Sequence, residues 1–304
     1  MSVNADYLPL SGKPFTISMG LRSLDLANWL EFDANYDAEL DLKRVLYRTH
    51  PYQVFASMPE GLTGSWETLD LISEFLKTQP ATFYESGFSH SDFAESNEGL
   101  SLRTKLETPS GSRLDHPLVS ASLLVQEDLC VMSRLNGEWV LTAASVCFPS
   151  RWDLTEKIGK SLQEIHNPVP HYKERIGTAT DTMFDKFDAS RPVWRLNWTI
   201  LDNPELFQPS SGQPRTNPEM TSSELAGLLQ LRVERQTLRV LPESKDVLFT
   251  IRTHQDSLAN IADKYPQFQE NLADTLAAAS DQTKAYKGWE PFWEQLLAWT
   301  RNAG

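Results

Sequence analysis

Cysteine is scarce in this chain: Cys130 and Cys147 are the only two among 304 residues. A disulfide framework, or a zinc or iron–sulfur site built from cysteine ligands, is therefore not expected. No apolar stretch approaches the roughly 20 residues that span a bilayer, and the N-terminal residues lack the basic start and apolar run of a signal peptide. These absences predict a cytoplasmic protein without a membrane-bound part.

Basic residues are also outnumbered, with 28 Lys and Arg against 41 Asp and Glu and a formal net charge of −13. Because binding to DNA or RNA needs a basic patch that neutralises phosphates, no nucleic-acid partner is expected. The sequence has no His-Glu-x-x-His, no paired Cys-x-x-Cys, no Cys-x-x-Cys-His for covalent haem, no glycine-rich phosphate loop and no Gly-x-Ser-x-Gly elbow. This argues against most common hydrolases, kinases and nicotinamide dehydrogenases.

Strand patterns fill the centre of the chain. Two apolar runs surround Asn136-Gly137, a pair that favours the type I′ turn of a hairpin. A two-residue loop there pairs Leu135 with Glu138 and puts Cys130 opposite Ala143, so the two cysteines are not partners. Both faces of this hairpin are apolar, and we expect it to be covered on both sides. Further strand patterns cover residues 192–200 and 228–254, the second with a turn at 242–246.

A helix is expected over residues 153–165, because an apolar stripe follows the N-cap candidates Ser150 and Asp153 and two prolines stop it at 168 and 170. Other helices are expected after Ser65, which would be an N-cap, and near residues 173–187. The last fifty residues also read as helices. Residues 86–115 and 203–221 read as polar connections.

The order of strand, strand, helices and three strands predicts an α+β fold. Its simplest packing is an antiparallel sheet of about five strands with helices on one face. The same order is that of a PAS domain, a fold that often holds haem or flavin. We therefore expect a PAS-like core at 116–256, an N-terminal helical or irregular segment at 1–115 and C-terminal helices at 257–304.

His166 lies at the end of the helix expected over 153–165. A histidine there most often caps the last carbonyls of the helix. It also lies at the edge of the apolar stripe, above Gly159, where a missing side chain would leave room for a flat group. The turn with the prolines would fix the imidazole in one direction, as an axial metal ligand requires. Both interpretations stay open, and His171 is the second candidate ligand.

Polar residues interrupt the strand pattern at 231–239. Alternation puts Arg232, Glu234 and Gln236 on one face and Arg235 on the other. Three successive polar residues on one face must be paired with other polar groups, be solvated or line a pocket. In the last case Glu234 or an arginine meets a substrate or a cofactor carboxylate, and Arg151 is a further candidate because guanidinium groups fit carboxylates.

Glu127 and Asp128 are adjacent carboxylates at the start of an apolar strand. Their side chains point to opposite faces, so both cannot enter one site. We expect one of them to cap the end of the strand.

Several blocks occur together, in this order and with these spacings: QEDLC, FPSRW, EKIGKSLQEIHNPVP, RLNWTI and LRVERQTLRVLP followed by VLFTIRTH. On these blocks the chain closely resembles the haem-dependent oxidative N-demethylase α-subunit-like family from about residue 35 to 280. The resemblance implies a PAS-like core that holds b-type haem without a covalent bond.

The resemblance also implies a monooxygenase that converts a small secondary amine or N-methyl compound to an amine and formaldehyde. Electrons would come from NADPH through the flavin and iron–sulfur cluster of reductase or ferredoxin-type partner subunits, and a partner subunit with tetrahydrofolate would capture formaldehyde. This sequence has no motif for flavin, nicotinamide or iron–sulfur binding. An enzyme of this kind must take its electrons from a partner.

From motif and geometry together, His166 is the expected axial haem ligand. Glu234 is expected to contact a protonated amine, because an ammonium in an apolar pocket needs an anion. Arg232 or Arg235 would lie near the haem propionates. The main alternative is a haem-PAS sensor of oxygen or another gas, without turnover.

Overall fold

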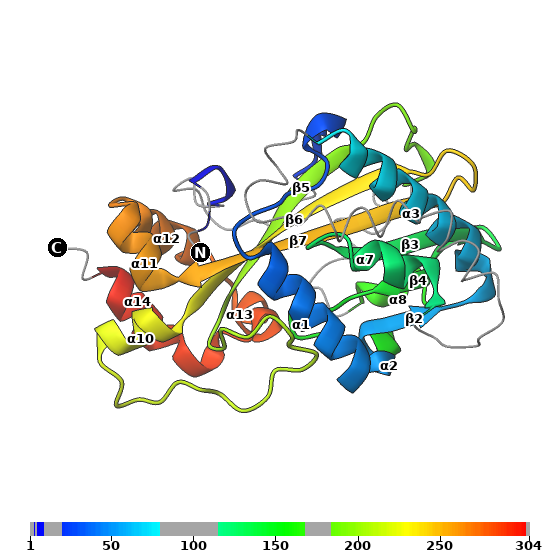
Figure 1. Ribbon diagram of the computed structural model, residues 1–304. Coiled ribbons are helices and arrows are strands. Elements are labelled where there is room, and N and C mark those ends of the chain that lie inside the picture. The colour runs from blue at the N-terminus through cyan, green and yellow to red at the C-terminus, as the bar shows by residue number, and fades with distance from the viewer. Residues whose placement is uncertain (1–2, 4, 9–19, 80–114, 168–183, 302–304) are drawn as a thin grey trace.

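The computed structural model describes residues 3, 5–8, 20–79, 115–167 and 184–301. Within these residues, one antiparallel sheet of seven strands has the order β1-β5-β6-β7-β3-β4-β2 (Figure 1). The expected α+β class is confirmed, but the count of about five strands is wrong because the N-terminal segment adds both edge strands. The strands are β1 (Arg22–Ser23), β2 (Phe55–Ser57), β3 (Asp128–Leu135), β4 (Glu138–Ser145), β5 (Val193–Leu201), β6 (Gln230–Val240) and β7 (Val247–Ser257).

Both expected hairpins are present. Strands β3 and β4 pair Leu135 with Glu138, as the Asn-Gly turn predicts. A β-bulge between Val131 and Met132 shifts the register by one residue, so Cys130 lies opposite Ala144 and not Ala143. Both cysteines are buried and free, which confirms that they are not partners. The second hairpin joins β6 to β7 through residues 241–246.

The described helices are α1 (Tyr36–Thr49), α2 (Pro51–Val54), α3 (Leu62–Lys77), α7 (Pro117–Ser122), α8 (Leu162–Ile165), α10 (Ser222–Leu228), α11 (Leu258–Lys264), α12 (Phe268–Leu276), α13 (Asp281–Lys287) and α14 (Trp293–Arg301). Helix α3 begins three residues before Ser65, which is buried within it and donates to the Gly61 carbonyl, so the N-cap expected there is wrong. None of these described helices is long and apolar enough to cross a bilayer. The helix expected at 173–187 lies mostly outside the described residues.

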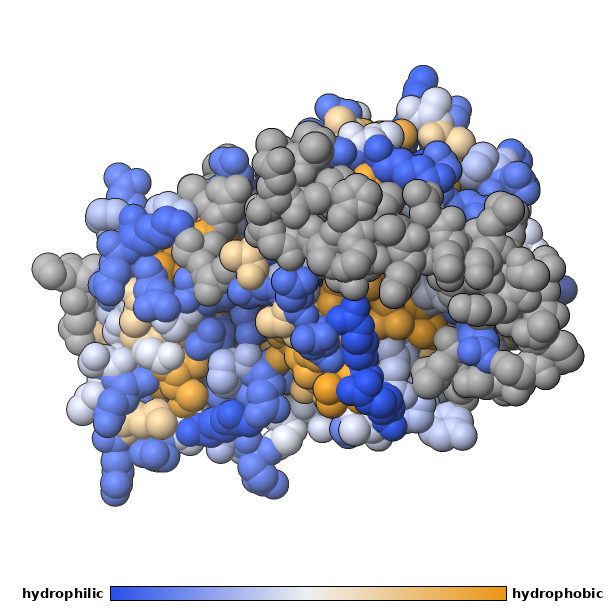
Figure 2. Space-filling view, in the orientation of Figure 1, coloured by the Kyte–Doolittle hydropathy of each residue, from blue (hydrophilic) through white to orange (hydrophobic). Residues whose placement is uncertain are grey.

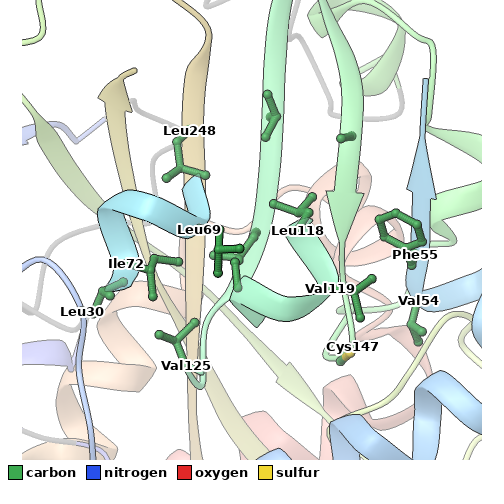
Figure 3. Packing of buried hydrophobic residues seen from close by; sticks show 14 of the residues in the cluster. Leu30, Val54, Phe55, Leu69, Ile72, Leu118, Val119, Val125, Cys147 and Leu248 are labelled. Atoms are coloured by element: carbon green, nitrogen blue, oxygen red, sulfur yellow. The ribbon is translucent and has the colours of Figure 1, made fainter. Parts of the chain in front are cut away.

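Arg235 and Glu234, neighbours on β6, point to opposite faces of the sheet, which are the Arg235 face and the Glu234 face. The Arg235 face carries Leu129, Val131 and Leu248, which pack against α3 and α7 in one hydrophobic cluster (Figure 3). The Glu234 face carries a second cluster, in which Cys130, Met132 and Leu238 pack against Leu154 and α8. Helices therefore cover both faces, and the expectation of helices on one face is wrong. The apolar side chains of β3 and β4 are covered on both sides, as expected.

The N-terminal helices do not form a separate layer of their own. Residues of α1 and α3 share one hydrophobic cluster with β3 and β7. On the side of the molecule that α1 covers, hydrophilic residues make up most of the described surface, with hydrophobic residues visible in the middle of it (Figure 2). The division of the chain at 115 and 256 stays a prediction.

The C-terminal helices gather around a third cluster, at one end of β5, β6 and β7 (Figure 1). Trp289 is its buried centre: its ring stacks on Trp198 of β5, with 5.7 Å between centroids, and on Trp293, with 6.1 Å. Stacked indoles bury a large apolar area at fixed geometry. This packing holds the end of α13 against β5.

Residues 153–165 do not form the continuous helix expected from the apolar stripe. Asp153 caps a single 3-10 turn, Leu154–Glu156, and the chain then runs along β4. The Gly159 amide donates to the Leu141 carbonyl at 2.8 Å. Ser161 then starts α8 with a capping box. The apolar residues of this segment do have helical spacing. However, Leu141 on the edge of β4 exchanges backbone hydrogen bonds with Gly159 and Lys160, and a continuous helix would have left these bonds unmade.

Candidate active site

Glu234 is buried near the middle of β6, with 7% of its surface exposed, and three neutral donors hold its carboxylate. Ser150 Oγ donates to Oε1 at 2.5 Å. The side-chain amides of Asn197 and Gln236 donate to Oε2 at 3.0 and 2.9 Å. Asn197 is the cross-strand neighbour of Glu234 on β5, and Gln236 lies two residues further along β6. The alternation read from the sequence thus brings polar residues of two strands together on one face.

Arg232 supports this carboxylate indirectly. Its side chain is fully buried and donates to the Phe148 carbonyl at 2.5 Å and the Leu206 carbonyl at 3.1 Å. The first contact fixes the segment that carries Ser150, two residues beyond Phe148. Burial lowers the pKa of Arg232, with Glu234 opposing that shift. Arg232 therefore stabilises the site through its hydrogen bonds to these two backbone carbonyls.

Asp128 fixes the same segment through its backbone amides. Its carboxylate accepts from the Cys147 and Phe148 amides at 2.8 and 2.9 Å. This confirms the expectation that one of the two adjacent carboxylates, Glu127 or Asp128, caps the strand end. Burial raises the pKa of Asp128 to about 6, against the opposing effect of Lys43.

Arg151 follows directly after Ser150 and has a left-handed backbone with φ of 60°. It forms a partly buried ion pair with Asp202, and its amide donates to the Gln208 carbonyl at 2.7 Å. These contacts hold Ser150 on the Glu234 face.

Lys287, the last residue of α13, reaches the same site. Its Nζ donates to the Trp198 carbonyl at 2.8 Å and contacts Asn197 Oδ1 at 3.4 Å. Sequence reasoning missed this lysine because it lies 53 residues beyond Glu234 in a stretch whose only pattern is helical. Asn197 was missed as well, although the alternation of the strand at 192–200, paired with that of β6, could have identified it.

His166 follows α8 and is partly buried. Its Nδ1 lies 2.8 Å from the Leu162 carbonyl, to which it must donate because a carbonyl only accepts. This bond is the C-terminal cap that we gave as one of the two interpretations. In this tautomer the lone pair lies on Nε2, as it does in histidines that bind a metal while Nδ1 donates to a carbonyl. His171 lies outside the described residues.

Gly159 is not below His166 on a shared helix, because that helix is interrupted. Its φ of 77° is the left-handed conformation that lets the chain turn onto β4, and only the Met58 sulfur would lie within 4 Å of a Cβ there. The turn accounts for this glycine without a ligand. A role for Gly159 in cofactor binding stays a prediction.

Arg235 lies on the opposite face, in a network of direct ion pairs. It contacts Glu31 at 3.2 Å and donates to the Asn28 and Trp29 carbonyls at 2.6 and 3.0 Å. Beside it, Arg252 bridges Asp33 and Glu39. Arg232 and Arg235 therefore cannot contact the same bound group.

A cavity of about 690 Å³ lies between the tips of the two hairpins. Trp139, Phe184 and Val240 line it together with Arg134 and Asp246. Burial raises the pKa of Asp246 to about 6. Neither Glu234 nor His166 is part of the described lining, so this cavity is separate from the polar site on β6.

Within the described residues, no group of three or more His, Cys, Asp and Glu side chains could hold a metal ion. A haem iron differs from such an ion, because the porphyrin supplies four ligands and the protein supplies an axial one. A haem site therefore does not need such a group, and His166 as the axial ligand stays a prediction.

A comparison with known protein families agrees with the blocks quoted from the sequence. The family model described as "Haem-dependent oxidative N-demethylase, alpha subunit-like" matches residues 20–297. The match includes the N-terminal helices, the whole sheet and nearly all of the C-terminal helices. It confirms the resemblance read from the sequence and extends it at both ends. The chain belongs to the haem-dependent oxidative N-demethylase, alpha subunit-like family.

Proposed function

We propose that this protein is the haem-binding oxygenase component of an oxidative N-demethylase that acts on a small secondary amine or a similar N-methyl compound. The family match over residues 20–297 carries this proposal. The family name implies haem dependence, oxidative chemistry and further subunits. The b type of the haem, the identity of the amine and the electron-transfer partners go beyond that name and are part of this proposal.

We place the proposed haem on the Glu234 face, which carries both apolar and charged side chains. Apolar side chains of β3, β6 and β7 cover one part of that face, and the polar group around Glu234 lies beside them. A porphyrin also has an apolar ring and a polar edge, but its propionate carboxylates would need the cations on or beside this face, Arg151 and Arg232, and not the carboxylate of Glu234. His166 is the proposed axial ligand, with Leu162 orienting its ring. Bound haem would supply the activation of oxygen.

Glu234 is the proposed acceptor for the substrate cation. A dialkylammonium that leaves water needs an anion or strong acceptors, and this carboxylate is buried yet held by three donors from neutral side chains. The ammonium must also lose its proton before the nitrogen or its methyl group is oxidised. Glu234 can accept that proton, as a general base does.

The arginines would have different tasks. Arg151 and Arg232 lie on or beside the Glu234 face and hold the segment around Ser150. Contacts from Arg151 or Arg232 to haem propionates stay a proposal. Arg235 could reach a bound carboxylate only on the far side of the sheet, where Glu31 already contacts it.

The test is to express the protein with adequate haem supply and to measure its visible spectrum and its release of formaldehyde from dimethylamine with a surrogate reductase. We expect a Soret band, and we expect Glu234→Gln to keep that band while turnover falls by about 100-fold or more, the usual contribution of general acid–base catalysis. The matched control is Glu205→Gln, which changes an exposed carboxylate.

For the axial ligand, His166→Ala should lose or shift the Soret band, whereas His50→Ala, at an exposed histidine, should not. An unchanged spectrum in His166→Ala would move the ligand to His171 or elsewhere. Haem without formaldehyde from any methylamine would favour a gas sensor over an enzyme.

A further inference from the structure

A lysine of the C-terminal helices approaches the Glu234 site. Helix α13 ends at Lys287, and Gly288, with a left-handed φ of 69°, turns the chain toward the buried Trp289. The stacking of Trp289 on Trp198 fixes this turn against β5. The Lys287 ammonium is thereby held on the Trp198 carbonyl, at 2.8 Å.

Asn197 connects this ammonium to the carboxylate. Its Oδ1 lies 3.4 Å from Lys287 Nζ, and its Nδ2 lies 3.0 Å from Glu234 Oε2. An ammonium only donates and a carboxylate only accepts, so one orientation of the amide satisfies both. The positive and negative charges are separated by a single side-chain amide, which is close enough for a strong electrostatic interaction at a partly buried site.

Other charged and titratable groups face Lys287 from each neighbouring element. Glu234 comes from β6 and Arg195 from β5. The ring of Tyr286 lies 5.7 Å from Nζ, and Arg151, paired with Asp202, approaches Gly288. Burial lowers the pKa of Lys287 to about 8; Glu234 opposes this shift, and Arg195 adds to it.

We propose that Lys287 is a specificity-determining residue of the Glu234 site, whose positive charge weakens the binding of cationic ligands to Glu234 and is relieved when the lysine loses its proton. The choice of a small alkylammonium as the ligand rests on the proposed function. The charge effect itself rests on the contacts among Lys287, Asn197 and Glu234.

The direction of the pH effect follows from these charges. While Lys287 is protonated, an ammonium that approaches Glu234 meets a like charge, and the carboxylate is already partly neutralised. When Lys287 is neutral, the same carboxylate attracts the ammonium without that opposition. Affinity for a ligand with a fixed positive charge should therefore rise as the pH rises through the range in which Lys287 titrates.

The experiment is a calorimetric titration of the haem-loaded protein with dimethylammonium and with tetramethylammonium from about pH 6.5 to about pH 9, a range in which both stay cationic. For the wild type we expect affinity to rise by about five- to tenfold, the order expected for one partly screened charge. Lys287→Arg keeps the charge and should bind weakly at every pH. Lys287→Gln keeps a donor without a charge and should bind tightly at every pH.

Lys284→Met is the matched control, because Lys284 lies on the same helix but pairs with Asp281. It should keep the wild-type pH profile, and circular dichroism should show that each variant folds. A wild-type pH slope in Lys287→Gln, or no ammonium binding at any pH, would overturn the inference. The titration needs no turnover, so missing formaldehyde would contradict the proposed function alone.

Discussion

The two faces of strand β6 bury polar groups in different ways. On the Arg235 face, cations and carboxylates contact each other directly: Arg235 pairs with Glu31, and Arg252 pairs with Asp33 and Glu39. On the Glu234 face, three neutral side chains hold the carboxylate, and the lysine reaches it only through an amide.

This difference separates a structural cluster from a candidate binding site. The three carboxylates that pair with arginine on the Arg235 face all come from the segment 31–39, so these ion pairs tie the N-terminal segment to the sheet. Direct pairs compensate buried charges that would otherwise be costly. Glu234 has no such direct ion pair among the described residues, and its charge can act on a ligand.

The largest loss of stability should come from removing the ion pairs of the Arg235 face. We expect Arg252→Met to lower the free energy of unfolding by about 4 kcal/mol, because it leaves Glu39 and Asp33 without their counter-charge. Urea unfolding of the variant and the wild type measures this change. Arg44→Met, which breaks an exposed pair with Asp41, should cost no more than about 0.5 kcal/mol. Similar losses in both variants would contradict the structural role.

A somewhat smaller loss of stability is expected when the pH is raised. Glu127 accepts the Glu31 amide at 2.8 Å, its Oε2 has no hydrogen-bond partner in the described structure, and burial raises its pKa to about 7 despite Arg252. The folded state thus binds this proton more tightly than the unfolded state. The protonated Glu127 therefore adds about 3 kcal/mol to the free energy of unfolding at low pH. This stabilisation is lost as the pH rises from about 4.5 to about 7.

Glu127→Gln removes that titration, so the fall in stability across this range should become shallower, and the part due to Asp128 and Asp246 should remain. Urea midpoints at several pH values measure it, with Glu74→Gln on the exposed side of α3 as the control. A variant whose stability falls with pH as steeply as the wild type would show that Glu127 is not the group responsible.

The smallest effect on stability is expected on the Glu234 face. Glu234→Gln loses a charge but keeps an acceptor and adds donors, so the free energy of unfolding should change by about 1 kcal/mol or less. The same variant should lose most of its turnover. A stability loss as large as that of Arg252→Met would remove the contrast between the two faces.

Much of the sheet could be predicted because its signals are local. The Asn136-Gly137 turn fixes the pairing of Leu135 with Glu138, and alternation correctly separates Glu234 from Arg235. The bulge at Val131 could not be predicted, since it depends on how β4 packs between its neighbours. The edge strands β1 and β2 are too short to leave a pattern.

The candidate site could be predicted only in part. Glu234 follows from the strand pattern. Ser150 and Asn197, which donate to it, and Lys287, which contacts Asn197, come from three distant parts of the chain. For Arg232, the sequence indicates the face but not that two backbone carbonyls occupy its guanidinium.

The sequence by itself determined the two hairpins, the alternation along β6 and the family, because turn chemistry, period and motif spacing are properties of the chain. Only the tertiary structure decided that residues 153–165 break into a 3-10 turn and α8, and that the edge of β4 takes up the segment between them. It also decided which buried charges meet directly and which meet through an amide. Both outcomes depend on which distant groups satisfy each buried donor and acceptor, and local sequence does not contain that information.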